Sequence, residues 1–97
     1  MYTSGVWNVK VGKEDEFARG WQASVDRISL EHSGVVFRLF RDVETPRRFV
    51  SLVGPWRSRE QVESVRASDS FRETMSAMSD VLDSYELSAF ELAVEVS

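Results

Sequence analysis

The 97-residue sequence contains no cysteine, one histidine and two prolines. Without cysteine the chain has no disulfide, no thiolate nucleophile and no thiolate metal site, which suits a reducing compartment. Neither a second histidine nor a cysteine is present to complete a nucleophilic triad or an imidazole-rich metal site. We therefore expect no metal centre, and composition alone identifies no catalytic residue.

Long apolar runs and an excess of positive charge are also absent. No segment reaches the roughly 20 apolar residues that span a bilayer, and the N-terminal MYTSGVWNVKV lacks the basic and apolar regions of a signal peptide. The formal net charge of -4 argues against nucleic acid, because affinity for phosphates comes largely from basic groups. We expect a cytoplasmic protein with neither a membrane nor a nucleic acid as partner.

What the sequence does contain is one domain, residues 1–97, with clear apolar periodicity. Residues 2–11 alternate between two faces, one of them carrying Trp7, which predicts a strand. Three acidic residues at 14–16 begin a helix that we expect to run to about residue 31. Its apolar side chains recur every three or four positions: Phe17, Trp21, Val25 and Ile28.

The middle of the chain predicts a hairpin, with strands at 35–42 and 48–54 joined by the turn-like VETPR. Both faces of this hairpin carry apolar groups, so both faces of the sheet need cover. One of these faces carries Val36, Phe40, Val50 and Leu52.

Two helices and a strand follow. Ser58 and Gln61 have the spacing of a capping box, and so do Ser70 and Glu73, although Ser68 or Asp69 are alternative caps for that helix. The last helix has an apolar stripe of Phe71, Met75, Met78 and Leu82, and we expect it to end near residue 84. Residues 86–96, ELSAFELAVEV, alternate as a fourth strand.

This order is the βαββαβ pattern of a ferredoxin-like α+β fold, with a four-stranded antiparallel sheet and its helices on one face. The apolar groups on the other face then need a partner, and a second copy of the sheet is the simplest one. The sequence predicts a homodimer.

The chain resembles the antibiotic biosynthesis monooxygenase family of dimeric α+β barrel proteins. Its most specific segment, GPWRSREQVESVRASDSF at 54–71, is similar to the family pattern W-x-S-x-E-x-hydrophobic followed by S-x-x-F. VGKEDEF with Trp21, and FRLFRD followed by RRFV, are similar to the family's first helix and central hairpin. The resemblance implies an oxidoreductase of antibiotic biosynthesis that oxygenates a small aromatic molecule without a cofactor.

Several positions depart from the family pattern. Gly5, Val65 and Met75 stand where haem-degrading or related members carry asparagine, histidine or tryptophan, so the resemblance does not extend to haem chemistry. Leu52 and Val62 stand where polyketide oxygenases carry asparagine and tyrosine. Of that polar and aromatic set only Trp56 is retained.

We predict that five residues bind the substrate: Trp56, Trp7, Phe71, Met75 and Arg38. Trp56 is either a pocket wall for a flat ring or a plug at the sheet edge, and we expect a partly open indole at the mouth of a cavity. Phe71 and Met75 can equally be core side chains. Arg38 can hold a phenolate if it projects inward, and otherwise faces solvent or an acidic group of the partner.

The remaining polar candidates are weaker. His32 has the pKa range of a neutral-pH base, but it lies at a helix end, where histidine commonly faces the last carbonyl groups. Four arginines, Arg57, Arg59, Arg66 and Arg72, form either a basic edge that attracts an acidic substrate or a solvated face. Two functions stay open: an oxygenase for a small aromatic compound, and a non-catalytic dimeric binding module.

Overall fold

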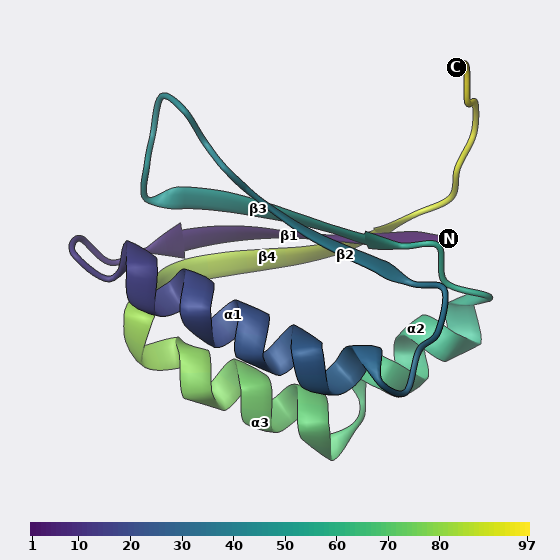
Figure 1. Cartoon of the computed structure of the whole chain (residues 1–97), viewed down its shortest axis with the longest axis horizontal. Helices are drawn as coiled ribbons and strands as arrows, with labels where there is room; N and C mark the ends of the chain where they lie inside the picture. The colour runs from purple at the N-terminus through teal and green to yellow at the C-terminus, as the bar shows by residue number, and fades with distance from the viewer.

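The computed structural model describes all 97 residues and contains a single four-stranded antiparallel sheet in the order β2-β3-β1-β4. α1 and α3 lie across one face of this sheet, and α2 lies near its end (Figure 1). The predicted ferredoxin-like fold is confirmed. In chain order the elements are β1 (Tyr2–Val9), α1 (Glu14–Ser29), β2 (Val36–Arg41), β3 (Arg48–Gly54), α2 (Arg59–Arg66), α3 (Asp69–Met78), the 3₁₀ helix η1 (Ser79–Val81) and β4 (Leu82–Phe90).

β1 is central and pairs with both β3 and β4, so that Trp7 lies opposite Phe49 on one side and Tyr85 on the other. The alternation predicted for this strand is confirmed, because Thr3, Gly5, Trp7 and Val9 are all buried toward the helices. β1 therefore supplies much of the floor on which the helices pack.

The buried apolar side chains form two separate clusters. The larger one centres on Phe17, whose ring centroid lies 5.7 Å from that of Trp7 and 5.1 Å from that of Phe49. The smaller one contains Val53, Trp56 and Val62. Protein interiors are normally close-packed. A core that is divided into two clusters is therefore unusual, and the region between the clusters is where a cavity is expected.

Two predicted boundaries are wrong at the end of the chain. α3 ends at Met78, and η1 then turns the chain so that Leu82 enters β4 opposite Val9. β4 ends at Phe90, so residues 91–97 do not continue the predicted strand. The N-cap of α3 is Ser68, which accepts a hydrogen bond from the Phe71 N–H. Of the predicted caps, the alternative Ser68 is therefore right, and Ser70 lies two residues too late.

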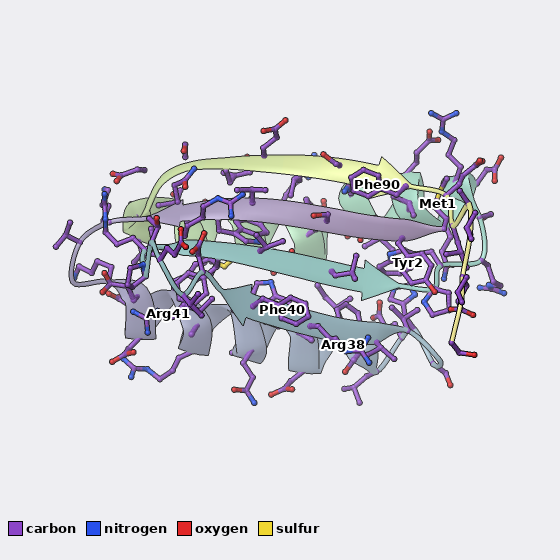
Figure 2. All side chains as sticks on the ribbon, turned by 90° about the horizontal axis from the view of Figure 1, so that it is seen from above. Met1, Tyr2, Arg38, Phe40, Arg41 and Phe90 are labelled. Atoms are coloured by element: carbon purple, nitrogen blue, oxygen red, sulfur yellow. The ribbon has the colours of Figure 1, made fainter.

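The face of the sheet away from the helices is open (Figure 2). Phe40 is 52% exposed there, and Val36, Leu52 and Phe90 are exposed as well. None of the helices combines the length and the hydrophobicity that a membrane span requires.

Candidate functional site

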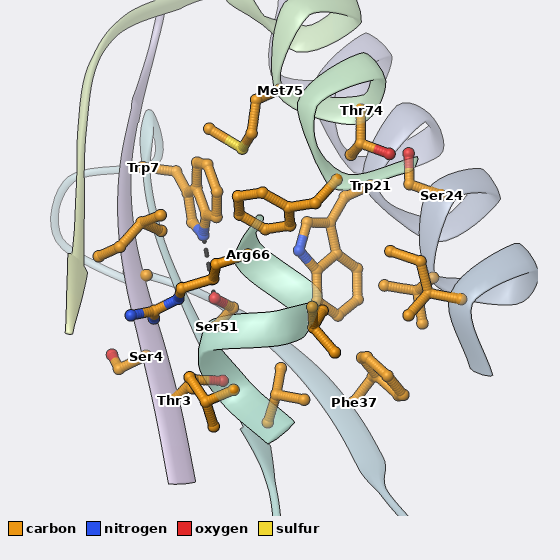
Figure 3. Close-up of a pocket in the computed structure, with 18 of the residues that line it drawn as sticks. Thr3, Ser4, Trp7, Trp21, Ser24, Phe37, Ser51, Arg66, Thr74 and Met75 are labelled. Carbon is orange, nitrogen blue, oxygen red and sulfur yellow. Dashed lines mark hydrogen bonds between the residues drawn. The ribbon is translucent and has the colours of Figure 1, made fainter. Parts of the chain in front are cut away.

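A cavity lies between the sheet and the three helices, in the space between the two core clusters (Figure 3). About 90 Å³ of it is open to the centre of a water molecule. This is several times the roughly 10–15 Å³ that one water needs, so a ring-sized ligand has room. Hydrophobic side chains make up 13 of the 20 lining residues, and the polar or small remainder is Thr3, Ser4, Gly5, Ser24, Ser51, Arg66 and Thr74.

All three tryptophans of the chain line this cavity. The Trp7 Nε1–H donates to Ser51 Oγ at 3.1 Å, and the Trp56 Nε1–H donates to Thr3 Oγ1 at 3.0 Å. Both indoles are thus fixed by hydroxyl groups of the sheet, which satisfies their only polar atom. Their rings are held in set orientations along the cavity wall.

Gly5 makes the position of Trp7 possible. A Cβ atom at residue 5 would lie 2.7 Å from three atoms of the Trp7 indole, closer than carbon atoms approach without displacement. A larger side chain at this position and the present Trp7 ring exclude each other. At residue 5 the chain lacks the asparagine of the haem-degrading members of the family it resembles. The position of the Trp7 ring gives a structural reason for glycine there.

Trp56 is both a wall and a plug. Its side chain is only 6% exposed, so the expected partly open indole is wrong. The ring lines the cavity, while its other neighbours are the edge-on rings of His32 and Phe37, with centroids 5.4 and 6.1 Å away. Trp56 also bonds to Met1 through the backbone: its N–H donates to Met1 O, and the Met1 amino group donates to Trp56 O. These two bonds continue the contact between the β1 and β3 segments beyond Gly54.

The structure brings four of the five predicted binding residues to the cavity: Trp7, Trp56, Phe71 and Met75. Arg38 is not among the lining residues, so it does not join the other four at this cavity. Its neighbours Phe37 and Leu39 face the helices, so strand alternation turns Arg38 to the open face, where it is exposed opposite Leu52 (Figure 2). His32 does not line the cavity either; its Nδ1 lies 3.4 Å from Gln61 Nε2.

None of the polar lining residues was among the predicted binding residues, and two of them, Arg66 and Thr74, lie on helices. Arg66 lies four residues after the buried Val62, and Thr74 lies three after Phe71, so helical spacing places each on an inward face. Burial lowers the pKa of the Arg66 guanidinium from its ordinary value, because removal of water disfavours the charged form. Arg66 carries the only charged side chain in the lining.

No acid or imidazole lines the cavity, and no group of three or more histidine, cysteine, aspartate and glutamate side chains is placed to hold a metal ion. The chemistry available from the protein is therefore an apolar, ring-lined space, a few hydroxyl groups and one guanidinium.

A family model described as antibiotic biosynthesis monooxygenase matches residues 2–77. Among curated proteins none matches the sequence significantly. A Deinococcus radiodurans protein named for the same family has a TM-score of 0.82 at 10% identity, covering 99% of this chain and 95% of its own. A conserved protein of Methanosarcina mazei Go1 has a TM-score of 0.76 at 21% identity, with coverage of 90% and 86%. These structural likenesses, at low identity, show the fold alone.

Proposed function

Because the chain belongs to the antibiotic biosynthesis monooxygenase family, we propose that it is a cofactor-independent monooxygenase of a small aromatic substrate, polyketide-like or quinol-like. One observation carries the proposal. The segment that resembles the family most closely supplies Trp56, Val62 and Phe71 to one wall of the cavity, and Trp7 and Trp21 face it from β1 and α1. A flat ring can stack within such walls.

The chemistry suits an apolar site. A substrate such as an anthrone loses a proton to become an electron-rich anion, which transfers one electron to O₂; the two radicals then combine into a peroxide. Protonation and loss of water leave a carbonyl, so that one oxygen atom enters the product and the other leaves in water with two hydrogens of the substrate. The protein supplies water exclusion, ring orientation and stabilisation of the anion.

Oxygen uptake tests the proposal directly. We expect anthrones or hydroquinones to consume one O₂ per molecule of carbonyl product, faster than without protein, because the cavity holds the reacting anion. Trp56→Phe should retain more of this activity than Trp56→Ala, since a ring is kept. Uptake that never exceeds the uncatalysed rate across both compound classes would contradict the proposal.

A second candidate is a binding module on the same scaffold, which the lack of an acid or imidazole in the lining favours. It predicts saturable binding of the same aromatic compounds with no oxygen uptake above background. Calorimetric titration beside the oxygen measurement separates the two functions.

We also propose that the open face of the sheet is covered by a second copy of the chain. This face carries four exposed apolar side chains away from the cavity: Val36, Phe40, Leu52 and Phe90. An apolar sheet face of this kind is commonly buried against another layer. The homodimer is the assembly in which we place the activity.

A further inference from the structure

Two polar groups in the mostly apolar lining each lack one kind of partner: the Arg66 guanidinium has no counter-ion, and the Thr74 hydroxyl has no hydrogen bond. Arg66, at the last turn of α2, reaches toward β1 on the sheet side, and Thr74 of α3 lies on the helix side (Figure 3). The aromatic walls lie between them. The partner that each group lacks indicates which ligand atoms would lie beside it.

Arg66 lacks a counter-ion. Its Nη2 donates to Ser88 O at 2.9 Å, which ties α2 to β4, but no carboxylate forms an ion pair with it. The side chain is half-buried, and no acidic residue lines the cavity. A guanidinium has five N–H donors, so those left over by Ser88 can bind an anionic oxygen from inside the cavity.

Thr74 lacks a hydrogen-bond partner altogether. The residue is 6% exposed, and its Oγ1 is the one buried side-chain nitrogen or oxygen atom in the structure without a partner. Ser24, which also lines the cavity, donates its hydroxyl to Gly20 O at 2.9 Å. A buried hydroxyl without a partner is costly, so an unpaired one beside a cavity indicates a place for a ligand atom.

We propose that Arg66 and Thr74 are the two polar anchors of the cavity and that its ligand is a flat aromatic acid or phenol. Its anionic oxygen binds Arg66, and a hydroxyl or carbonyl group at its far end bonds to Thr74. This inference rests on the proposed function, since it takes the cavity to be the substrate site. It narrows the substrate from any small aromatic compound to one with polar groups at opposite ends.

The same arrangement accounts for activation without a base in the lining. An arginine beside a phenol favours the phenolate over the neutral form, and the effect strengthens where water is excluded. A phenolate is also the electron-rich form that reacts with O₂. Arg66 is thus a binding residue that also selects the reactive ionisation state.

Matched rigid ligands test the two anchors, with calorimetry under nitrogen so that no turnover intervenes. The two-ring set is 2-naphthalenemethanol, 2-naphthoate and 6-hydroxy-2-naphthoate, and the one-ring set is benzyl alcohol, benzoate and 4-hydroxybenzoate. In at least one set, wild-type protein should bind the acid about 10- to 100-fold more tightly than the neutral alcohol. The distal hydroxyl should add about threefold to tenfold.

The variants assign these effects to residues. Arg66→Met should remove the preference for the acid over the alcohol, while Arg27→Met, the same change on the exposed surface of α1, should keep it. Thr74→Val should remove only the gain from the distal hydroxyl, with Thr45→Val in an exposed turn as its control. Circular dichroism shows whether each variant is folded. If Arg66→Met does not fold, Arg66→Gln, which removes the charge but keeps an N–H donor for Ser88 O, should likewise remove the preference for the acid.

If the wild-type protein binds the acid and the alcohol with equal affinity in both sets, Arg66 does not bind an anionic oxygen in the cavity. The wild-type measurement alone decides this point. A hydroxyl gain that persists in Thr74→Val would overturn the role of Thr74. Because binding is measured without oxygen, a failure of these comparisons is distinct from a failure of oxygen uptake, which bears on the proposed function.

Discussion

Trp56 belongs to the core and also lines the cavity. It is buried, its N–H is held by Thr3, and one part of its ring still lines the cavity. We expect Trp56→Ala to lower the free energy of unfolding by about 3–5 kcal/mol, as truncation of a buried aromatic residue does. Trp56→Phe should cost less, since only part of the volume and the hydrogen bond are lost. Urea denaturation measures both, and an alanine variant as stable as wild type would show that the ring is not part of the core.

Individual site residues were predictable to the extent that alternation and helical spacing define an inward face. Those patterns identified Trp7, Phe71 and Met75 because their side chains are apolar. The same patterns also place Arg66 and Thr74 on inward faces. Polar residues are usually exposed, however, so their residue types alone predict that they lie at the surface. Which polar residue is buried without a partner depends on neighbours distant in sequence, and the sequence does not specify them.

The short helices depend on their caps. Ser68 accepts the Phe71 N–H at 3.2 Å, and its own hydroxyl donates to Val65 O at 2.6 Å, so it joins the end of α2 to the start of α3. We expect Ser68→Ala to destabilise the protein by about 1 kcal/mol. Ser70→Ala is the matched control, since Ser70 is exposed inside the first turn and alanine favours a helix there. Equal melting temperatures for the two variants would contradict the assignment of the cap.

Element types followed from apolar periodicity, whereas two boundaries did not. Leu82 fits the helical stripe of Phe71, Met75 and Met78, yet it also fits a strand, and pairing with Val9 decides in favour of the strand. The alternation of residues 91–97 likewise continues that of β4, but Phe90 pairs with Tyr2, the first residue of β1, and β4 ends there. Both outcomes depend on the length of a neighbouring strand, which local sequence does not contain.

At the scale of the molecule, the sheet separates two surfaces of different character. The helix-covered face holds the divided core and the cavity between its parts, and the open face carries exposed apolar groups. Residues of one strand serve both faces: in β3, Phe49 and Val53 pack under the helices while Val50 and Leu52 face outward. A substitution on the open face can therefore leave the lining of the cavity unchanged.

This separation makes the proposed dimer testable with one charge. We expect light scattering at micromolar concentration to give twice the chain mass for the wild-type protein. Leu52→Glu should shift it to the mass of one chain, because an unpaired carboxylate is costly to bury against another apolar face.

Val43→Glu is the control: Val43 is 95% exposed in the β2–β3 turn and lies outside the sheet face, so this variant should remain dimeric. Circular dichroism should show both variants folded, since neither side chain belongs to the core. A wild-type protein that scatters as one chain would remove the dimer, and the apolar open face would then need a different partner.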